Sequence, residues 1–278
     1  MSAFPATRLH SERADQTRAR ILDAAVQQFS VNGLAGARTE QIADAAGVNK
    51  ALLYYYFKSK EALYAAALDS VAEGVRASSM AVLEGAASAG ERFLRSALNH
   101  FDRIHTNRCF QSLMQQEMIR LHRGESHALS TLAKNVFRPL MERMQQVLDE
   151  GIASGELIAT DPAQIRYAAL GANVLYFLSA PLVRLMGGGD PLERGALKFR
   201  RKAAMEFLGQ AIFTNRKHGA RVAARVLEST PMQRNRRPSA ALSKPKPSRE
   251  APSRQAKSKG TKSMAAQGGK AAMSSQTK

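Results

Sequence analysis

The chain has 278 residues, a formal net charge of +18 at pH 7 and 44% hydrophobic residues, enough for a substantial core. It has one cysteine, Cys109, so no intrachain disulfide can form, and no apolar run approaches the ~20 residues of a membrane helix. The first residues lack the apolar stretch of a signal peptide. We therefore expect a soluble, cytoplasmic protein with no membrane partner.

The first 60 residues carry the signals of three helices and the start of a fourth. A helix is predicted over 11–30, and Asn32-Gly33 is a stop signal after it. Shorter helices are predicted over 39–45 and 49–57, with a turn at Gly47, and Ser59 can cap a fourth helix. The first helix has apolar side chains at spacings of three and four: Ile21, Leu22, Ala25, Val26 and Phe29.

The segment from about 90 to 215 reads as a series of longer amphipathic helices. One of them is lined by apolar residues from Leu129 to Ile152. Asp161-Pro162 pairs an N-cap with a first-turn proline and begins a helix to about Ser179. Pro191 is expected to open the last helix, which runs to about His218. No alternating Val/Ile/Thr-rich segment indicates a strand, so we predict an all-α fold.

The composition changes near the C-terminal end. Most of the positive excess lies after Arg216, where only Glu228 and Glu250 are acidic, and Phe213 is the last aromatic residue. Such a segment has too little apolar surface to offset the entropy of folding, so 219–278 is predicted to be a basic, mostly disordered tail. It would serve either as a solubilising tail or as a source of nonspecific DNA affinity.

Within TEQIADAAGVNKALLYYYF, two predicted helices meet at an angle. Ala43 is small where the second helix must approach, and Gly47 supplies the tight turn. Apolar anchors close a small core between them: Ile42, Val48, Leu53 and Phe57. This is the pattern of a helix-turn-helix.

The other face of the second helix has a different chemistry. With Leu53 and Phe57 inward, the outward positions hold Lys50, Ala51, Tyr54 and Tyr55. A lysine suits guanine or phosphate acceptors, alanine suits thymine methyl groups, and a phenol suits a phosphate oxygen. The spacing therefore favours a major-groove reading helix over an aromatic patch for protein contact.

The segment from Thr17 to Leu63 resembles the N-terminal domain of the tetracycline-repressor (TetR/AcrR) family of bacterial regulators. The matching residues include Ile21-Leu22, Phe29, Ala46-Gly47-Val48, Leu53-Tyr54 and Ser59-Lys60-Glu61. Arg38 stands where the family often has a capping Ser or Thr, so either Thr39 caps the helix or Arg38 reaches a phosphate. The resemblance implies that the following residues lie at or near DNA: Arg38, Thr39, Lys50, Ala51, Leu52, Tyr54, Tyr55, Tyr56 and Lys60.

For the remainder of the chain the resemblance implies a helical domain with a cavity for a small effector and a dimer formed by the last two long helices. The expected division is a DNA-binding domain over 11–60, an effector-binding and dimerisation domain over 61–218, and the tail over 219–278. Small residues in the late helices agree with close packing of helices in a dimer. The candidate effector contacts are His105, Phe110, Met114, Glu117, Asn173 and Tyr176.

We found no sequence pattern for an enzyme, a metal site or a cofactor. The histidine pairs His100/His105 and His122/His127 are five residues apart, which splays them on a helix, and no Gly-rich phosphate loop is present. We therefore expect a regulator bound as a homodimer to a palindromic operator in the bacterial nucleoid, most simply a repressor released by an effector. The alternative is an architectural DNA-binding protein dominated by the basic tail.

Overall fold

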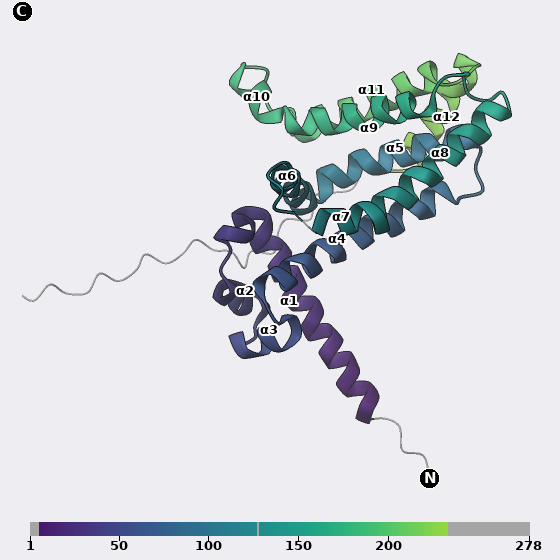
Figure 1. The fold of residues 1–278 in the computed structure, drawn as a ribbon. Coiled ribbons are helices and arrows are strands. Elements are labelled where there is room, and N and C mark those ends of the chain that lie inside the picture. Colours follow the sequence, from purple (N-terminus) through teal and green to yellow (C-terminus); the bar gives the residue numbers. More distant parts are fainter. Residues whose placement is uncertain (1–5, 127, 233–278) are drawn as a thin grey trace, which may run out of the picture. The chain divides into compact units, whose positions relative to one another are not determined.

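The structure is a computed structural model that describes residues 6–126 and 128–232 (Figure 1). Over these residues the regular structure is helical, apart from an isolated β-bridge between Leu157 and Phe213, so the all-α prediction is confirmed. None of the described helices is long and apolar enough to span a bilayer. In chain order the elements are α1 (Ala6–Gly36), α2 (Thr39–Ala46), α3 (Lys50–Phe57), α4 (Lys60–Leu83), α5 (Ala89–Thr106), α6 (Arg108–His122), α7 (Ala128–Leu132), a π-helical turn η1 (Ala133–Phe137), α8 (Arg138–Ala153), α9 (Pro162–Leu178), α10 (Ala180–Leu185), α11 (Arg194–Ala211) and α12 (Arg216–Ser229).

The signals in the first 60 residues act as predicted, although α1 begins earlier, at Ala6. Gly33 interrupts α1 with a non-helical backbone (φ 68°, ψ 177°), and Gly47 ends α2 in the left-handed region at φ 65°. The side chains of Asn49 and Ser59 accept hydrogen bonds from the amides of Leu52 and Ala62, which caps α3 and α4.

The start of α2 differs from the expectation. Arg38 occupies the cap position without a side-chain cap bond, and Thr39 is the first helical residue rather than the cap. The buried Thr39 hydroxyl lies beside Tyr54 instead. Thr39 therefore does not cap α2, because its hydroxyl is turned toward α3.

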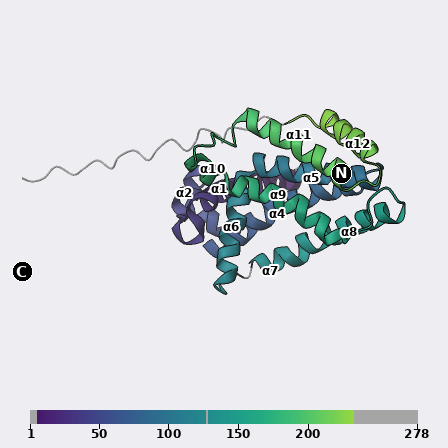
Figure 2. The ribbon, with the colours of Figure 1, turned by 90° about the horizontal axis from the view of Figure 1, so that it is seen from above.

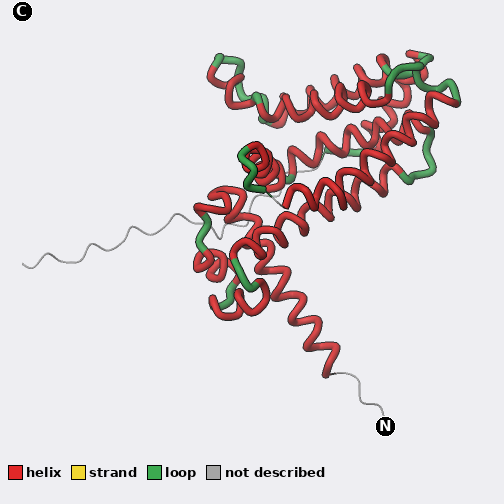
Figure 3. The backbone as a smooth tube through the Cα atoms, viewed as in Figure 1, coloured by secondary structure: helices red, strands yellow, loops and turns green. Residues whose placement is uncertain are grey.

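Two cores share the long helix α4. The first half of α4, with Tyr64 and Leu68, packs with α1, α2, α3, α6, α7 and η1. Its end, with Leu83, packs with the core formed by α5, α8, α9, α11 and α12. Figures 1 and 3 show α4 running from the α1–α3 group toward the second set of helices, and α11 and α12 pack against α5 (Figure 2).

The helix expected over residues 129–152 is divided. The π-helical turn η1 separates α7 from α8, and Pro139 stands in the first turn of α8. Proline has no amide hydrogen to donate to the preceding turn, so the regular hydrogen-bond ladder is broken next to η1.

The C-terminal boundaries were predicted wrongly. The last long helix, α11, runs from Arg194 to Ala211, and the chain breaks at residues 212–215 before continuing as α12. Residues 219–229 are thus helical, and Val222, Ala223 and Val226 are buried. This short amphipathic helix buries enough apolar surface to fold on α11 and α5, which a composition count overlooked. Residues 233–278, the rest of the predicted tail, lie outside the described residues.

The contact between α11 and α12 depends on two glycines. A Cβ at Gly219 would fall on the carbonyl oxygen of Gly209 and 2.7 Å from the Phe213 ring. We predict that Gly219→Ala lowers the free energy of unfolding by about 1–3 kcal/mol because the two helices must separate. Gly74→Ala is the control, since nothing lies within 4 Å of that position; it should raise stability by about 0.5–1 kcal/mol. Urea unfolding measures both, and equal effects would refute the close contact.

Candidate functional site

Helix α3 has one anchored face and one exposed face. Leu53 is 0% exposed and Phe57 is 5% exposed, and both belong to the first core. On the opposite side Lys50, Ala51 and Tyr55 are exposed. The predicted division of α3 is therefore observed except at Tyr54, which was expected on the outward face and instead packs half-buried against the first core. Leu52 joins the outward face at 36% exposure.

The three consecutive tyrosines have different surroundings. Tyr54 is half-buried, with its hydroxyl 3.3 Å from Oγ1 of the buried Thr39. Tyr56 is also half-buried and meets the ring of Tyr55 edge to face at 5.5 Å. Tyr55 is 70% exposed. Thr39 thus lies behind the surface and orients Tyr54, whereas Tyr55 is the ring most available to a partner.

An ion pair ties the outward face of α3 to α2. Lys50 Nζ contacts the Glu40 carboxylate and lies 5.9 Å from the centre of the Tyr54 ring. The hydrogen bond between them lowers the pKa of Glu40 and raises the pKa of Lys50. Because both side chains are exposed, water screens the pair and little free energy is lost when Lys50 changes partner.

Three further cations surround this face. Arg38 is exposed, and Lys60 Nζ donates to the carbonyl oxygen of Ala35 at 3.1 Å. Lys58, between α3 and α4, has a left-handed backbone at φ 45° and lies 5.6 Å from the centre of the Tyr55 ring. The sequence interpretation missed Lys58, although its place between Phe57 and the Ser59 cap signals an exposed turn.

A second candidate site is a cavity of about 220 Å³ between the two cores. Val75 and Ser79 of α4 lie on its wall, at the part of α4 between the two cores. Helices α5, α6, α8 and α9 and the turn η1 supply the rest. The wall is mostly apolar, with His100 and Arg103 as its basic groups.

The six predicted effector contacts do not converge on this cavity. Phe110 lines it, and Asn173 contacts the lining residue His100 from behind at 3.4 Å. His105 lines a neighbouring groove and not the cavity, and Met114 packs on the first core. The Tyr176 hydroxyl donates to the carbonyl of Pro191. The cavity is instead formed by residues such as Ser79, His100 and Arg103, which the sequence places on two different helices, α4 and α5.

Glu117, the sixth candidate effector contact, is surrounded by hydrogen-bond donors of the chain itself. Its carboxylate is fully buried and accepts hydrogen bonds from Tyr64 Oη at 2.7 Å, Arg120 Nη1 at 2.6 Å and the Ser126 hydroxyl. These donors come from α4, α6 and the segment after α6. A buried carboxylate with three donors is satisfied within the chain, so Glu117 joins helices rather than facing the cavity.

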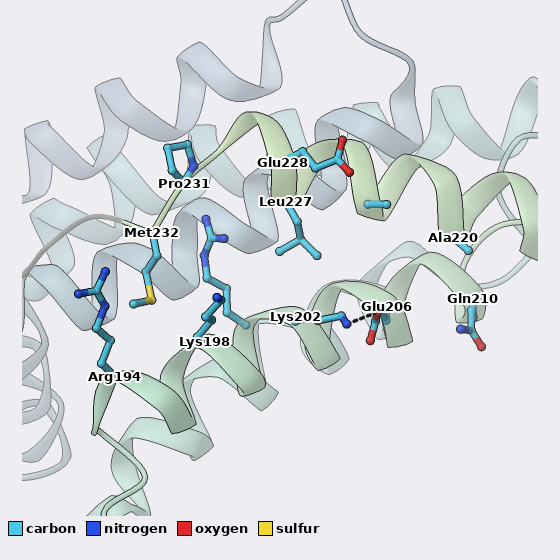
Figure 4. A pocket seen from close by; sticks show the side chains of 12 residues that line it. Arg194, Lys198, Lys202, Glu206, Gln210, Ala220, Leu227, Glu228, Pro231 and Met232 are labelled. Atoms are coloured by element: carbon cyan, nitrogen blue, oxygen red, sulfur yellow. Dashed lines mark ion pairs between the residues drawn. The ribbon is translucent and has the colours of Figure 1, made fainter.

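Another hollow lies between α11 and α12 (Figure 4). This open groove of about 830 Å³ has a basic side, with Arg194, Lys198 and Lys202, and Lys202 Nζ lies 3.6 Å from Glu206 Oε1. Its other side carries Leu227 and Met232. It does not touch α6 or the α1–α3 group, so the 220 Å³ cavity is the better candidate for a site linked to α3. Within the described residues no group of three His, Cys, Asp or Glu side chains could hold a metal ion.

Family models match both the N-terminal and the C-terminal part of the described chain. Residues 21–67 match the family described as "Bacterial regulatory proteins, tetR family", and residues 91–208 match "Tetracyclin repressor-like, C-terminal domain". The transcriptional regulatory protein RaaS of Mycobacterium tuberculosis is 31% identical over 170 residues, covering 59% of this chain and 73% of RaaS. The chain belongs to the TetR family.

Other members of the TetR family align over different lengths. The transcriptional repressor NicS of Pseudomonas putida is 45% identical over 65 residues, which cover 23% of this chain and only 31% of NicS. A Saccharomonospora viridis transcriptional regulator solved in complex with choline has a TM-score of 0.57 and 18% identity, covering 72% of this chain and all of that one; this likeness concerns the fold. As a TetR-family member the protein is a DNA-binding transcriptional regulator.

Because α3 has an exposed face and an anchored face, substitutions on the two faces should affect DNA binding and stability separately. Tyr55→Ala should weaken DNA binding by about 1 kcal/mol through a lost contact and leave stability nearly unchanged, because the ring is exposed. Phe57→Ala should lower the free energy of unfolding by about 3 kcal/mol, because it empties part of the first core. Fluorescence anisotropy and urea unfolding separate the two effects. A Tyr55→Ala protein with unchanged DNA affinity would show that this face does not read DNA.

Proposed function

We propose that the protein is a homodimeric repressor that reads a palindromic operator with α3 and leaves it when a small effector fills the cavity. The main observation behind this proposal is the two-sided character of α3. Its outward face exposes Lys50, Ala51 and Tyr55, and its inward residues Leu53 and Phe57 anchor it in the first core. Helices of this size enter the major groove, where lysine and alanine contact base edges and a phenol reaches the backbone. Repression accords with the name of NicS, which matches the DNA-reading half.

The phosphate contacts would come from cations at the rim. Arg38, Lys58 and Lys60 lie at the two ends of the α2–α3 unit, where the DNA backbone passes a helix seated in the major groove. Lys50 would exchange Glu40 for a DNA acceptor. Acting on the chromosome, the regulator would work in the bacterial cytoplasm at the nucleoid, and it would need no catalytic group.

The dimer would form through exposed apolar side chains on α9, α10 and α11. Phe199 and Phe207 on α11 are 75% and 68% exposed. The stripe on α9 and α10 recurs at spacings of three and four: Tyr167, Gly171, Leu175, Leu178 and Leu182. The Arg200 guanidinium lies 5.5 Å from the Tyr176 ring centre, so α9 and α11 are neighbours. Exposed apolar stripes on adjacent helices are typical of a symmetric four-helix interface.

Small residues contribute less to this interface than the sequence suggested. Gly171 and Ala172 are exposed on α9, but Ala169, Ala204 and Gly209 are buried within the chain. Gly209 faces α12. The large exposed side chains are therefore the better markers of the proposed contact.

Effector binding would reach α3 through α6. Phe110 and Gln111 at the start of α6 line the cavity. Further along α6, Ser112 Oγ and Gln116 Nε2 donate to the carbonyl oxygen of Ser30 at 2.6 and 3.0 Å. Ser30 precedes the Gly33 interruption that leads into α2. A shift of α6 on filling the cavity would thus move the segment that carries the reading helices.

The direct test is selection of bound sequences from a random DNA pool, followed by binding to the selected site at several salt concentrations. We expect a palindrome whose half-site centres are about one helical turn, ~34 Å, apart. Phe207→Glu should give a monomer in sedimentation equilibrium and lose the palindrome preference, because a charge would be buried in the interface. Ile119→Glu, at an exposed apolar residue on α6, is the matched control and should remain dimeric.

The alternative of an architectural protein gives different results. Enrichment of no sequence, with random DNA competing equally, would refute the proposed repressor and favour coating of DNA by the basic segment. A chain ending at Met232 keeps α12 whole and removes that segment. For a repressor it should keep the sequence preference and show a shallower dependence of affinity on salt.

A further inference from the structure

The cavity between the two cores has an unusual charge for an apolar space. Its described walls include Val75, Phe110, Phe137 and Met144, and no aspartate or glutamate is among the residues that line it. The basic group Arg103 is present without an acid. The missing carboxylate is the feature that a ligand would supply.

Arg103 is half-buried and differs from the buried Arg92 and Arg201, which pair with carboxylates. Its Nη1 donates to Ser79 Oγ at 2.7 Å and lies 3.4 Å from Ser78 Oγ, but no carboxylate of the described residues lies within 4.0 Å. The neighbouring Asp102 is committed to Arg201, with two bonds of 2.8 Å. Burial lowers the pKa of Arg103 to about 10, which reflects a poorly solvated cation.

His100, one turn before Arg103, adds a neutral donor. Burial and the nearby Arg103 lower its pKa to about 4, so the ring is uncharged at neutral pH. Asn173 Nδ2 donates to the Ala97 carbonyl at 3.0 Å and lies 3.4 Å from His100 Nδ1. Nδ1 then accepts, which leaves the ring hydrogen on Nε2.

A route leads to Arg103 from outside. A groove lined by Val71, Thr106 and Arg108 shares Val75 and Arg103 with the cavity wall. Arg103 therefore lies on the wall of both the groove and the cavity, and the groove also carries the exposed Arg108 and the exposed Asp23.

We propose that the cavity binds a small apolar molecule with one carboxylate, which pairs with Arg103 while its hydrocarbon part packs on the apolar wall. Water occupies about 30 Å³ per molecule, so a 220 Å³ cavity has the volume of about seven waters. Covalently bonded atoms lie closer together than separate waters, so the cavity suits a ligand of about ten non-hydrogen atoms or fewer. This names the chemical class of the effector and so rests on the proposed function. Choline, the ligand of the Saccharomonospora viridis regulator, has the opposite charge and would be rejected.

Benzoate, benzamide and benzylamine form a matched set of probes: an acid, its neutral amide and a related cation. Hexanoate and phenylacetate, each with its amide, extend the set. Calorimetry on the full chain should give at least one acid an affinity about tenfold or more above its amide, because a charge-assisted bond is stronger than a neutral one. Benzylamine should not bind.

Substitutions at Arg103 test whether this side chain causes the preference for acids over amides. Arg103→Met removes a poorly solvated charge and should fold with unchanged or higher melting temperature, yet lose the preference for acids. Arg103→Lys should keep part of the preference. Arg123→Met, at an exposed arginine beyond the end of α6, is the control and should bind like the wild type.

Three results would overturn the proposal: no acid of the set binds, the amides bind as well as the acids, or Arg103→Met keeps the preference. Binding to the selected DNA site is measured on the same samples without ligand. Wild-type and Arg103→Met proteins that bind this DNA while the acids fail would refute the effector class and leave the regulator intact. Acid binding by a chain that selects no DNA site would refute the proposed function alone.

Discussion

The buried carboxylate of Glu117 is the constraint on which the arrangement of α1, α4 and α6 depends. Its donors come from α4, from α6 and from Ser126, and Tyr64 carries the connection onward by meeting Phe29 of α1 edge to face at 4.9 Å. Burial, and then the hydrogen bond to Glu117, raise the pKa of Tyr64, so its hydroxyl stays a donor. An unpaired buried carboxylate would be costly, so α1, α4 and α6 are held together wherever this network forms.

The Glu117 network matters for function because α6, which carries Glu117, also forms part of the cavity wall. The helix that contributes Glu117 also contributes Phe110 to the cavity wall and Gln116 to the bond with Ser30. Helix α6 therefore touches the cavity, carries the buried carboxylate and contacts the helix that leads to α2 and α3. A ligand that changes the position of α6 must disturb either the Glu117 network or the Ser30 contacts, and both hold the DNA-reading half.

Local signals in the sequence predicted the fold of the first 60 residues well, because each acts over a few residues. The positive φ at Gly47, the Asn49 and Ser59 caps and the inward Leu53 and Phe57 follow from short-range sterics and periodicity. The cavity was not predictable in this way. Ser79, His100 and Met141 meet only when α4, α5 and α8 pack together, and Glu117 looked like a polar ligand contact until its three donors were in place. Helix α12 escaped prediction because its few buried residues lie in a basic, polar stretch.

The most direct test of the central claim is hydrogen exchange with and without the selected DNA, in the wild type and in Tyr64→Phe. This substitution removes one donor of Glu117 and keeps the ring. If the buried network couples α6 to α2 and α3, DNA binding should slow exchange in α2 and α3 and also in α6 of the wild type, whereas in Tyr64→Phe the protection of α6 should be lost. Protection confined to α2 and α3 in the wild type, or identical protection of α6 in both proteins, would contradict the account.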